Sequence, residues 1–358
     1  MDETDRIVLD TAERLFSECC DAELVNRAGD GEVPGALMKA VLESGLPLAW
    51  VAEEAGGVGG SLALGFNLIR QTGGFALPVP LAETLVANLL LGQAGLALGE
   101  GWTGLAYDGG SLPVAADGRV SGVVEGACGV VEAELLVVPV LRDGAVAIAG
   151  FEPEAVTARH YRNPAGEART KLVFDEAVPL CLSAPLTAMS ESGLYQFCAL
   201  VRAAQIAGAL DKIVALTVGY VKERQQFGRP LAKFQAIQHK VAEIAGEAAL
   251  SGASVEQAVR LLSAHGQPFA DDPALFRALA TAKLLASEAA GPVAREAHQA
   301  HGAMGFSFEY PLQQYSRRVW SWREEFGSEF YWSSQLGMAV ACGISSGATA
   351  KVWDFVSP

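Results

Sequence analysis

ERQQFGRPLAKFQAIQHKVAE, at residues 223–243, joins two long amphipathic segments and decides how the chain is organised. Apolar residues recur at helical spacing before it, over 206–214, and after it, over 234–244. An arginine, an aromatic residue and a glycine lie together in the connection. The pattern predicts two long helices of a bundle, with a short polar turn between them.

Arg224 in this turn has two interpretations. As a cation at a helix C-terminus, it would be favoured by the helix dipole, and Gly228 would cap the helix. As a ligand, its forked guanidinium beside exposed backbone N–H groups and the ring of Phe227 would suit the two anionic oxygens of a pyrophosphate. The surrounding residues favour the second interpretation, in which Arg224 binds an anionic ligand.

Outside this turn, the chain divides into three regions with different sequence patterns. Apolar residues at helical spacing extend from the start to about residue 100, short β-rich runs with turn signals occupy 104–179, and helical patterns return after Ser183. We expect an α+β fold made of helices, a small antiparallel β-barrel-like region and a bundle of long helices. Strands and helices do not alternate, which disfavours a Rossmann fold.

The composition excludes several classes of function. A formal charge of −15 and the lack of a Lys/Arg stripe disfavour nucleic acid. The six cysteines are scattered, which indicates reduced thiols in a cytoplasmic protein and predicts no metal site. The apolar stretch from Leu81 is broken by polar residues, so we expect no membrane span. Hydrophobic residues make up 51% of the chain, which suggests burial between subunits.

A second stretch contains residues that could bind a ligand. It reads AHQAHGAMGFSFEYPLQQYSRRVWSWREEFGSE, at residues 297–329. Gln299 is followed by Gly302 and Gly305, where missing side chains would let the backbone approach a flat or anionic ligand. For Trp320 and Trp322, burial in a core or an interface is the favoured interpretation.

Together these stretches resemble the acyl-CoA dehydrogenase family, FAD enzymes that desaturate acyl-CoA thioesters between the α and β carbons. R-Q-Q-F-G-R-P-L followed by F-Q-A-I-Q-H-K is similar to the family's R-x-x-F-G signature, and Q-A-H-G-A-M-G is similar to Q-x-x-G-G-x-G. The resemblance implies an N-terminal helical domain (1–103), a middle β-barrel domain (104–183) and a C-terminal four-helix bundle (184–358) carrying FAD and oligomer contacts. It also implies an acyl-CoA substrate and electron-transfer flavoprotein as electron acceptor.

The resemblance assigns roles to individual residues. Arg224, Gln226 and Phe227 would reach the FAD of a neighbouring chain, with Gln226 replacing the usual serine or threonine. Gln299, Gly302 and Ala303 would approach the adenosine side of that FAD. Ala303 replaces a usual glycine.

The family's catalytic base is missing from its usual place. Most relatives carry a glutamate 27 residues after the glutamine of the second signature, which is Phe326 here, followed by Gly327 and Ser328. Ser328 retains the serine or threonine that follows the base and is assigned to the cofactor. Glu325 is a weak candidate base, because adjacent helical positions point about 100° apart.

Two further observations concern the missing catalytic base. The alternative for Glu325 is a solvated acid or an ion pair with Arg317, Arg318 or Arg323. Some relatives carry the base on the helix before the arginine signature, but the equivalent neighbourhood, 197–199, holds no acid.

The β region also departs from the family, because it lacks the T-E-P segment and the aromatic strand with I-T or I-S that hold the flavin ring. The chain thus keeps the residues that serve a neighbour's FAD and loses those that serve its own. This favours a subunit that supplies FAD contacts to a homologous catalytic partner in a heterotetramer, as in bacterial breakdown of steroid side chains. The alternatives are a self-sufficient homo-oligomeric dehydrogenase and a flavin-free scaffold.

Overall fold

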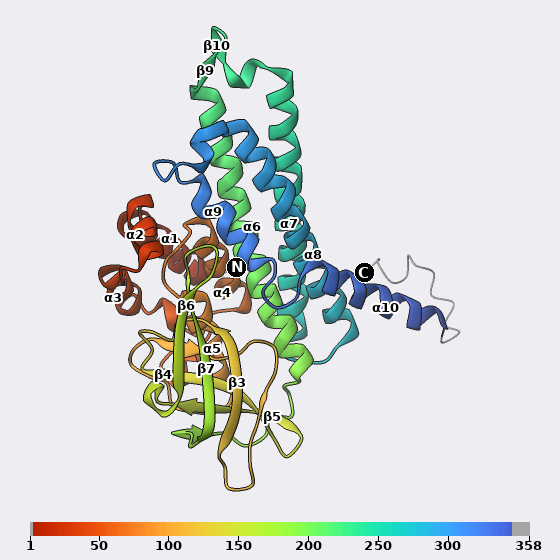
Figure 1. Cartoon of the computed structure of the whole chain (residues 1–358). Helices are drawn as coiled ribbons and strands as arrows, with labels where there is room; N and C mark the ends of the chain where they lie inside the picture. Colours follow the sequence, from red (N-terminus) through yellow and green to blue (C-terminus); the bar gives the residue numbers. More distant parts are fainter. Residues whose placement is uncertain (1–2, 346–358) are drawn as a thin grey trace.

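The structure, a computed structural model, describes the backbone of residues 3–345 and the side chains of residues 3–341. It has the expected order of a helical N-terminal domain, a β domain and a C-terminal helical domain, running from red through yellow and green to blue (Figure 1). The five cysteines whose side chains are described are free thiols, and Cys342 lies outside the described side chains.

The N-terminal domain consists of five helices and two short 3₁₀ turns. They are α1 (Glu3–Cys19), α2 (Ala22–Asp30), α3 (Gly35–Glu43), η1 (Leu46–Leu48), η2 (Glu53–Ala55), α4 (Leu62–Gly74) and α5 (Leu81–Gln93). Asp21 and Ser61 begin α2 and α4 by accepting backbone N–H groups of the first turn. Eleven residues of α5 are buried, so this helix lies inside the molecule.

The β domain is built from two sheets that pack face to face. Its strands are β1 (Thr103–Leu105), β2 (Leu112–Pro113), β3 (Val120–Ala127), β4 (Leu135–Arg142), β5 (Ala145–Phe151), β6 (Thr157–Arg162), β7 (Ala168–Ala177) and β8 (Cys181–Leu182). One sheet has the order β1-β4-β5-β8 with β2 also on β4, and the other has the order β3-β7-β6. Val124, Val138 and Phe174 are among the apolar side chains buried together.

The prediction that this β region is antiparallel was wrong for two short strands. β1 and β2 both pair in parallel with β4, while the remaining pairs are antiparallel. In both pairs at least one other strand lies between the two partners in the chain, so no hairpin turn imposes an antiparallel pairing.

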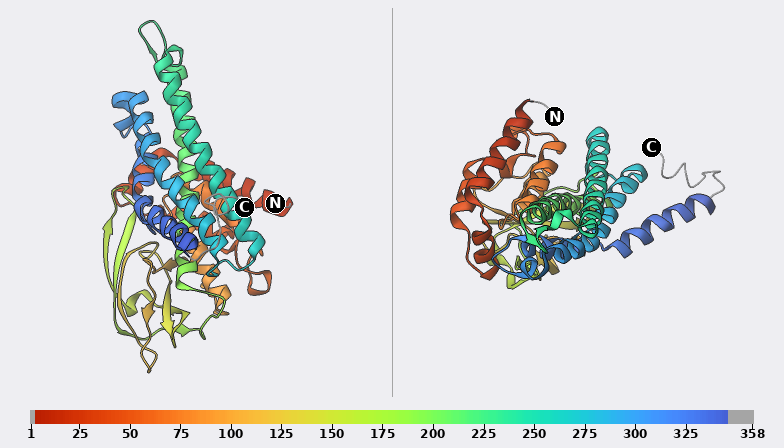
Figure 2. Two further views of the ribbon diagram at one scale, coloured as in Figure 1. Left: turned by 90° about the vertical axis from the view of Figure 1, so that its right-hand side faces the viewer. Right: turned by 90° about the horizontal axis from the view of Figure 1, so that it is seen from above.

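The C-terminal domain is dominated by three long helices. Its elements are α6 (Glu191–Glu223), β9 (Gln225–Gln226), β10 (Arg229–Pro230), η4 (Leu231–Lys233), α7 (Gln235–His265), α8 (Pro273–His301), η5 (Gly302–Phe306), α9 (Leu312–Trp322) and α10 (Glu329–Ser345), whereas the 3₁₀ turn η3 (Pro153–Ala155) belongs to the β domain, between β5 and β6. Helices α6, α7 and α8 pack on one another, and the β9–β10 hairpin projects beyond their upper end (Figure 1). Helix α10 extends away from the body (Figure 2).

Glycines bring the N-terminal domain against α6. A Cβ atom at Gly73 of α4 would lie 2.0 Å from the carbonyl oxygen of Gln205, and one at Gly208 of α6 would lie 1.9 Å from that of Arg70. The two backbones can approach this closely only because neither residue has a side chain. The crossing places α4 and α5 beside the middle of α6.

No helix in the described part of the chain is long and apolar enough to cross a membrane. Over the same residues, no group of three or more His, Cys, Asp or Glu side chains could hold a metal ion.

Candidate functional site

The residues of the first signature lie on an exposed hairpin at the end of α6. Arg224 is the C-cap residue, and its backbone N–H donates to the carbonyl of Tyr220. Phe227 and Gly228 both have positive φ, at 54° and 79°, as a two-residue hairpin turn requires. The Phe227 side chain is 90% exposed. A positive φ is uncommon for a residue other than glycine, and here the two-residue turn imposes it.

The residues of the second signature lie at the same end of the bundle. Gln299 is exposed near the end of α8, and Gly302 and Ala303 are exposed in η5. Tyr220 joins the two regions: its ring stacks on His301 with centroids 4.4 Å apart, and its hydroxyl donates to the His301 carbonyl at 3.2 Å. The fold therefore brings both predicted groups of cofactor residues to one surface.

A separate cavity of about 340 Å³ lies lower in the molecule. It is bounded by β3, β7, the first half of α6 and the loop after α9, and its lining includes Tyr107, Cys128, Tyr195, Arg202 and Phe326. Arg202 and Arg224 are 22 residues apart, which corresponds to about 33 Å along a helix rising 1.5 Å per residue. In one chain, the hairpin and the cavity are therefore well separated. Ser328 does not line the cavity; its hydroxyl accepts the backbone N–H of Tyr331 at 3.4 Å.

Phe326, where the family resemblance in the sequence places the base, contributes an aromatic wall to this cavity. Its ring stacks on Tyr107 with centroids 6.0 Å apart, and it meets Tyr195 edge to face at 6.0 Å. The guanidinium carbon of Arg202 lies 6.0 Å from the Phe326 ring centroid. Phe326 has a φ of 52°, so the loop holds this side chain in an unfavourable backbone conformation.

Glu325 also faces the cavity, where it forms a buried ion cluster. One of its oxygens lies 2.7 Å from Nη2 of Arg169, and the other lies 2.7 Å from Nε of Arg202. Arg202 also pairs with Glu83 at 2.7 Å, and Arg169 pairs with Glu167 at 2.9 Å. We call these five residues the ion cluster. Burial tends to raise the pKa of Glu325, but Arg169 and Arg202 outweigh it and lower this pKa to about 2.

The geometry corrects the sequence interpretation of Glu325 in two ways. Helix α9 ends at Trp322, so residues 323–328 form an irregular loop and both Glu325 and Phe326 reach the cavity. The arginine partners are also not the predicted neighbours in the chain, because Arg169 comes from β7 and Arg202 from α6.

Sequence reasoning missed Arg169, Arg202 and Glu83. Arg202 carried a signal, because it is the one charged residue in the apolar run FCALVRAAQIAGAL at 197–210. An arginine at such a position is buried and requires acidic partners. Its side chain is 2% exposed.

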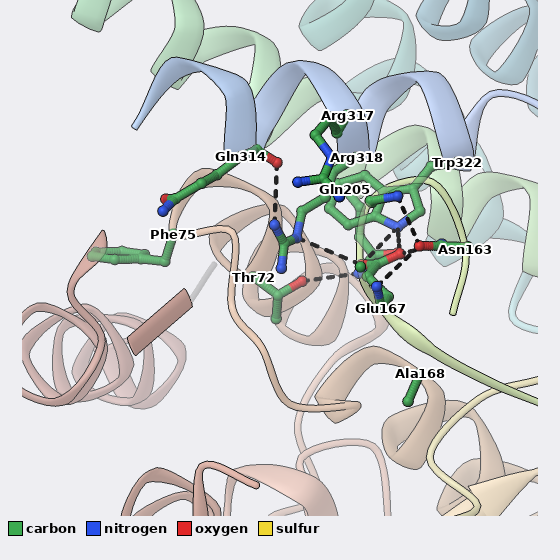
Figure 3. A network of polar contacts seen from close by, with 12 residues as sticks. Thr72, Phe75, Asn163, Glu167, Ala168, Gln205, Gln314, Arg317, Arg318 and Trp322 are labelled. Atoms are coloured by element: carbon green, nitrogen blue, oxygen red, sulfur yellow. Dashed lines mark hydrogen bonds and ion pairs between the residues drawn. The ribbon is translucent and has the colours of Figure 1, made fainter. Parts of the chain in front are cut away.

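Glu167 extends the ion cluster toward α9 (Figure 3). Its carboxylate accepts from Nε1 of Trp322 at 3.1 Å and from the amide of Asn163 at 2.8 Å, and it lies 3.6 Å from Nε of Arg318. Nearby, the amide of Gln205 donates to the Thr72 hydroxyl at 3.2 Å. Polar side chains thus fill the space between β7, α6 and α9.

Lys283 holds the loop that carries Glu325 and Phe326. Its ammonium nitrogen donates to the carbonyls of Arg323 and Gly327, both at 2.7 Å, and to the Ser287 hydroxyl at 3.0 Å. The side chain is fully buried, and burial lowers the pKa of Lys283 to about 7. Both ends of the loop are therefore tied to α8.

The two surfaces differ in how well they would fit a dinucleotide cofactor. The Arg224 guanidinium is exposed, and none of the described acidic groups pairs with it, so it fits an anion supplied by another molecule. In the cavity, the ion cluster and Phe326 occupy the wall, and the hydroxyl of Tyr107 is buried without a hydrogen-bond partner among the described residues. A charged cluster does not suit the uncharged flat ring of a flavin.

Comparisons with known proteins agree with this architecture. Residues 196–331 match the family described as acyl-CoA dehydrogenase, C-terminal domain. The chain is 30% identical over 278 residues to acyl-CoA dehydrogenase IpdE2 of Mycobacterium tuberculosis, covering 75% of each chain. It is 26% identical over 323 residues to IpdE2 of Mycolicibacterium smegmatis, covering 89% of this chain and 93% of the relative.

Two solved structures have the same fold. The ChsE4–ChsE5 complex from Mycobacterium tuberculosis matches with a TM-score of 0.83 at 20% identity, covering 95% of this chain and 98% of the other. The Tcur3481–Tcur3483 steroid ACAD G363A variant matches with a TM-score of 0.83 at 21% identity, covering 96% and 99%.

Proposed function

Because the chain belongs to the acyl-CoA dehydrogenase family of oxidoreductases acting on CH–CH bonds, we propose that it is the non-catalytic subunit of a heteromeric family member. In this proposal it supplies FAD contacts to a homologous partner that performs the α,β-desaturation. The observation that carries the proposal is Phe326 at the position of the base, with the adjacent Glu325 locked between Arg169 and Arg202.

The chemistry explains why these residues matter. Desaturation requires a carboxylate that removes the α proton, and bound FAD supplies the acceptor for the β hydride. A phenylalanine cannot accept a proton. Glu325 is a weak base, because its pKa is about 2 and its two oxygens are already paired with two arginines.

The hairpin gives the chain its proposed role toward the partner. Arg224 would pair with the pyrophosphate of the partner's FAD, and Gln226 and Phe227 would pack beside it. Gln299, Gly302 and Ala303 would approach the adenosine side. These residues are exposed, lie at one end of the bundle and are distant from the chain's own cavity.

The proposed substrate is a steroid-derived acyl-CoA. The support for it is the similarity in fold to the Tcur3481–Tcur3483 protein, which is a steroid ACAD, and to the ChsE4–ChsE5 complex, which contains two different chains. We propose electron-transfer flavoprotein as the electron acceptor of the complex, by analogy with the family.

A self-sufficient dehydrogenase is the second candidate function, because Glu325 lines the cavity and its side chain is 24% exposed. In that case Glu325 would have to leave both arginines before it could accept a proton. The homo-oligomer would then bind its own FAD.

The decisive measurement is the FAD-to-chain ratio of the protein purified alone and co-expressed with its encoded homologue. The proposal predicts little FAD alone and about one FAD per two chains in the complex, since only one subunit type retains a flavin site. Near one FAD per chain when alone would support the self-sufficient enzyme. No FAD in either preparation would indicate a flavin-free scaffold.

Arg224→Ala tests the hairpin within the complex. Loss of a charge-assisted pair with a phosphate should weaken FAD retention by about tenfold or more. Lys222→Ala is the matched control, because Lys222 is an exposed cation two residues earlier. Unchanged flavin occupancy in Arg224→Ala would remove Arg224 from the site.

A further inference from the structure

A second cavity of about 160 Å³ lies on the opposite side of the ion cluster. It is bounded by the connection between α2 and α3, the segment before α5, the turn between β6 and β7, and Arg318 of α9. Glu83, Cys128 and Arg169 line both cavities, so the ion cluster forms part of the wall between them.

Apolar side chains form part of the surface of this second cavity, and charged and polar groups form the rest. Val33, Pro34 and Met38 line it on the side of α3, and Leu77 and Val130 line it on the side of the β domain. Met38, Leu77 and Val130 are buried, whereas Val33 is half-exposed at the edge. A cavity of about 150 Å³ can hold a molecule the size of benzene, so this one has room for a single small ring.

Arg318 is the polar group of this cavity that lacks adequate partners. Its side chain is 5% exposed. Nη1 donates to the carbonyl of Gln314 at 3.1 Å, while Nε makes no hydrogen bond and lies 3.6 Å from Glu167 (Figure 3). A guanidinium has five N–H donors, and buried donors without acceptors are costly.

Glu167 makes no hydrogen bond to the Nε–H of Arg318. Its oxygens already accept from Arg169, Trp322 and Asn163. Arg318 therefore has an unpaired Nε–H beside a cavity with apolar side chains on part of its wall, and such a donor can orient a ligand carrying one hydrogen-bond acceptor.

The charges around the cavity select an uncharged ligand. Glu32, Glu83, Glu132 and Glu167 all line it, and they would repel a carboxylate or a phosphate. Arg318, together with Arg162 and Arg169, would repel a cation. A neutral carbonyl oxygen can accept from Arg318 without meeting either repulsion.

We propose that this second cavity binds a neutral alicyclic carbonyl compound. The ring packs on the apolar walls, and the carbonyl oxygen accepts from the guanidinium of Arg318. This site is distinct from the cavity that contains Phe326 and from the hairpin, and it does not depend on which subunit carries the base.

Cyclohexanone is the probe that tests the site, on the full chain in the state in which it is purified, with its partner if the two copurify. Saturation-transfer NMR should show saturable binding with a millimolar Kd, as expected for so small a ligand. Cyclohexanecarboxylate, which has the same ring and a negative charge, should bind at least about tenfold more weakly.

Two variants locate the binding. Arg318→Met removes the donors and keeps an apolar stem, and it should weaken cyclohexanone binding about tenfold or more. Arg317→Met is the matched control and should bind normally, because Arg317 does not line the cavity and donates instead to the carbonyl of Pro164. If Arg318→Met does not fold, Val33→Phe at the edge of the cavity should weaken binding by filling it.

Three results would overturn the proposal. One is that the unmodified protein shows no saturable binding of cyclohexanone at concentrations up to about 10 mM, which is about ten times a Kd of 1 mM. Another is full binding by folded Arg318→Met, or by Val33→Phe where that variant is used. The third is tighter binding of cyclohexanecarboxylate, which would make the cavity an anion site.

Discussion

Glu325→Gln should destabilise the protein and leave turnover by the assembled complex nearly intact. In the structure, the Glu325 carboxylate is shared by Arg169 and Arg202, whose side chains are 7% and 2% exposed. Glutamine carries no charge and turns one acceptor into a donor that faces an arginine. Removing one member of a buried ion pair leaves an uncompensated charge.

The magnitude follows from the pKa of Glu325. A carboxyl whose pKa falls from 4.5 to about 2 on folding contributes about 3 kcal/mol at neutral pH. The side chain is 24% exposed, so we expect a loss of about 2–3 kcal/mol in the free energy of unfolding. For 358 residues, an unfolding entropy of about 0.75 kcal/mol/K converts this loss into a Tm lower by about 3–4 °C.

The sign of the pH dependence is also determined. Because the folded pKa lies below the unfolded one, the stabilisation is complete above about pH 4.5 and is lost as the pH falls toward 2. The stability difference between the unmodified protein and Glu325→Gln should therefore shrink over this acid range.

The assay combines urea denaturation with turnover of the complex. Glu324→Gln is the matched control: this exposed neighbour pairs with Arg323 at 3.1 Å, and its loss should cost less than about 1 kcal/mol. Unchanged stability together with a thousandfold loss of turnover in Glu325→Gln would refute the reasoning and identify Glu325 as the base.

Other residues give further tests. Lys283→Met should lower the free energy of unfolding by about 1–3 kcal/mol, because two loop carbonyls lose their donor. A denaturation midpoint like that of the unmodified protein would show that Lys283 does not hold the loop. Because the folded pKa of Lys283 is about 7, below its usual 10.5, the stability of the unmodified protein should rise with pH between these values, and this rise should be absent in Lys283→Met. Gly73→Ala should lower the free energy of unfolding by about 1–3 kcal/mol, since the added Cβ would lie 2.0 Å from a backbone oxygen. Gly92→Ala in α5 is the control: its Cβ would enter open space, and the variant should be more stable by about 0.5–1 kcal/mol. Similar thermal midpoints for the two variants would refute the close crossing of α4 and α6.

The helix–β–helix order could be predicted because its signals are local. The spacing of apolar residues over 206–214 and 234–244 indicates helices whatever surrounds them, and D-G and N-P-A-G turns divide the strands. The parallel pairing of β1 and β2 with β4 was not predictable in the same way. Strand direction depends on how the chain returns to the sheet, which local patterns do not encode.

For the candidate site too, part could be predicted from local sequence and part required the structure. The motif residues Arg224 and Gln299 could be found by their spacing, and the structure adds that Tyr220 and His301 join them at one end of the bundle. Their assignment to a partner's FAD stays a prediction.

The sequence by itself indicated the helix–β–helix order, the signature in the turn after α6 and a phenylalanine where the family resemblance places the base, because each is encoded in neighbouring residues. Only the tertiary structure decided what Glu325 does. Its partner Arg169 lies 156 residues away in the chain, and Arg202 lies on a third element. Buried charges pair with whichever opposite charges the packing of helices and sheets brings within reach, and that packing is not local in the sequence.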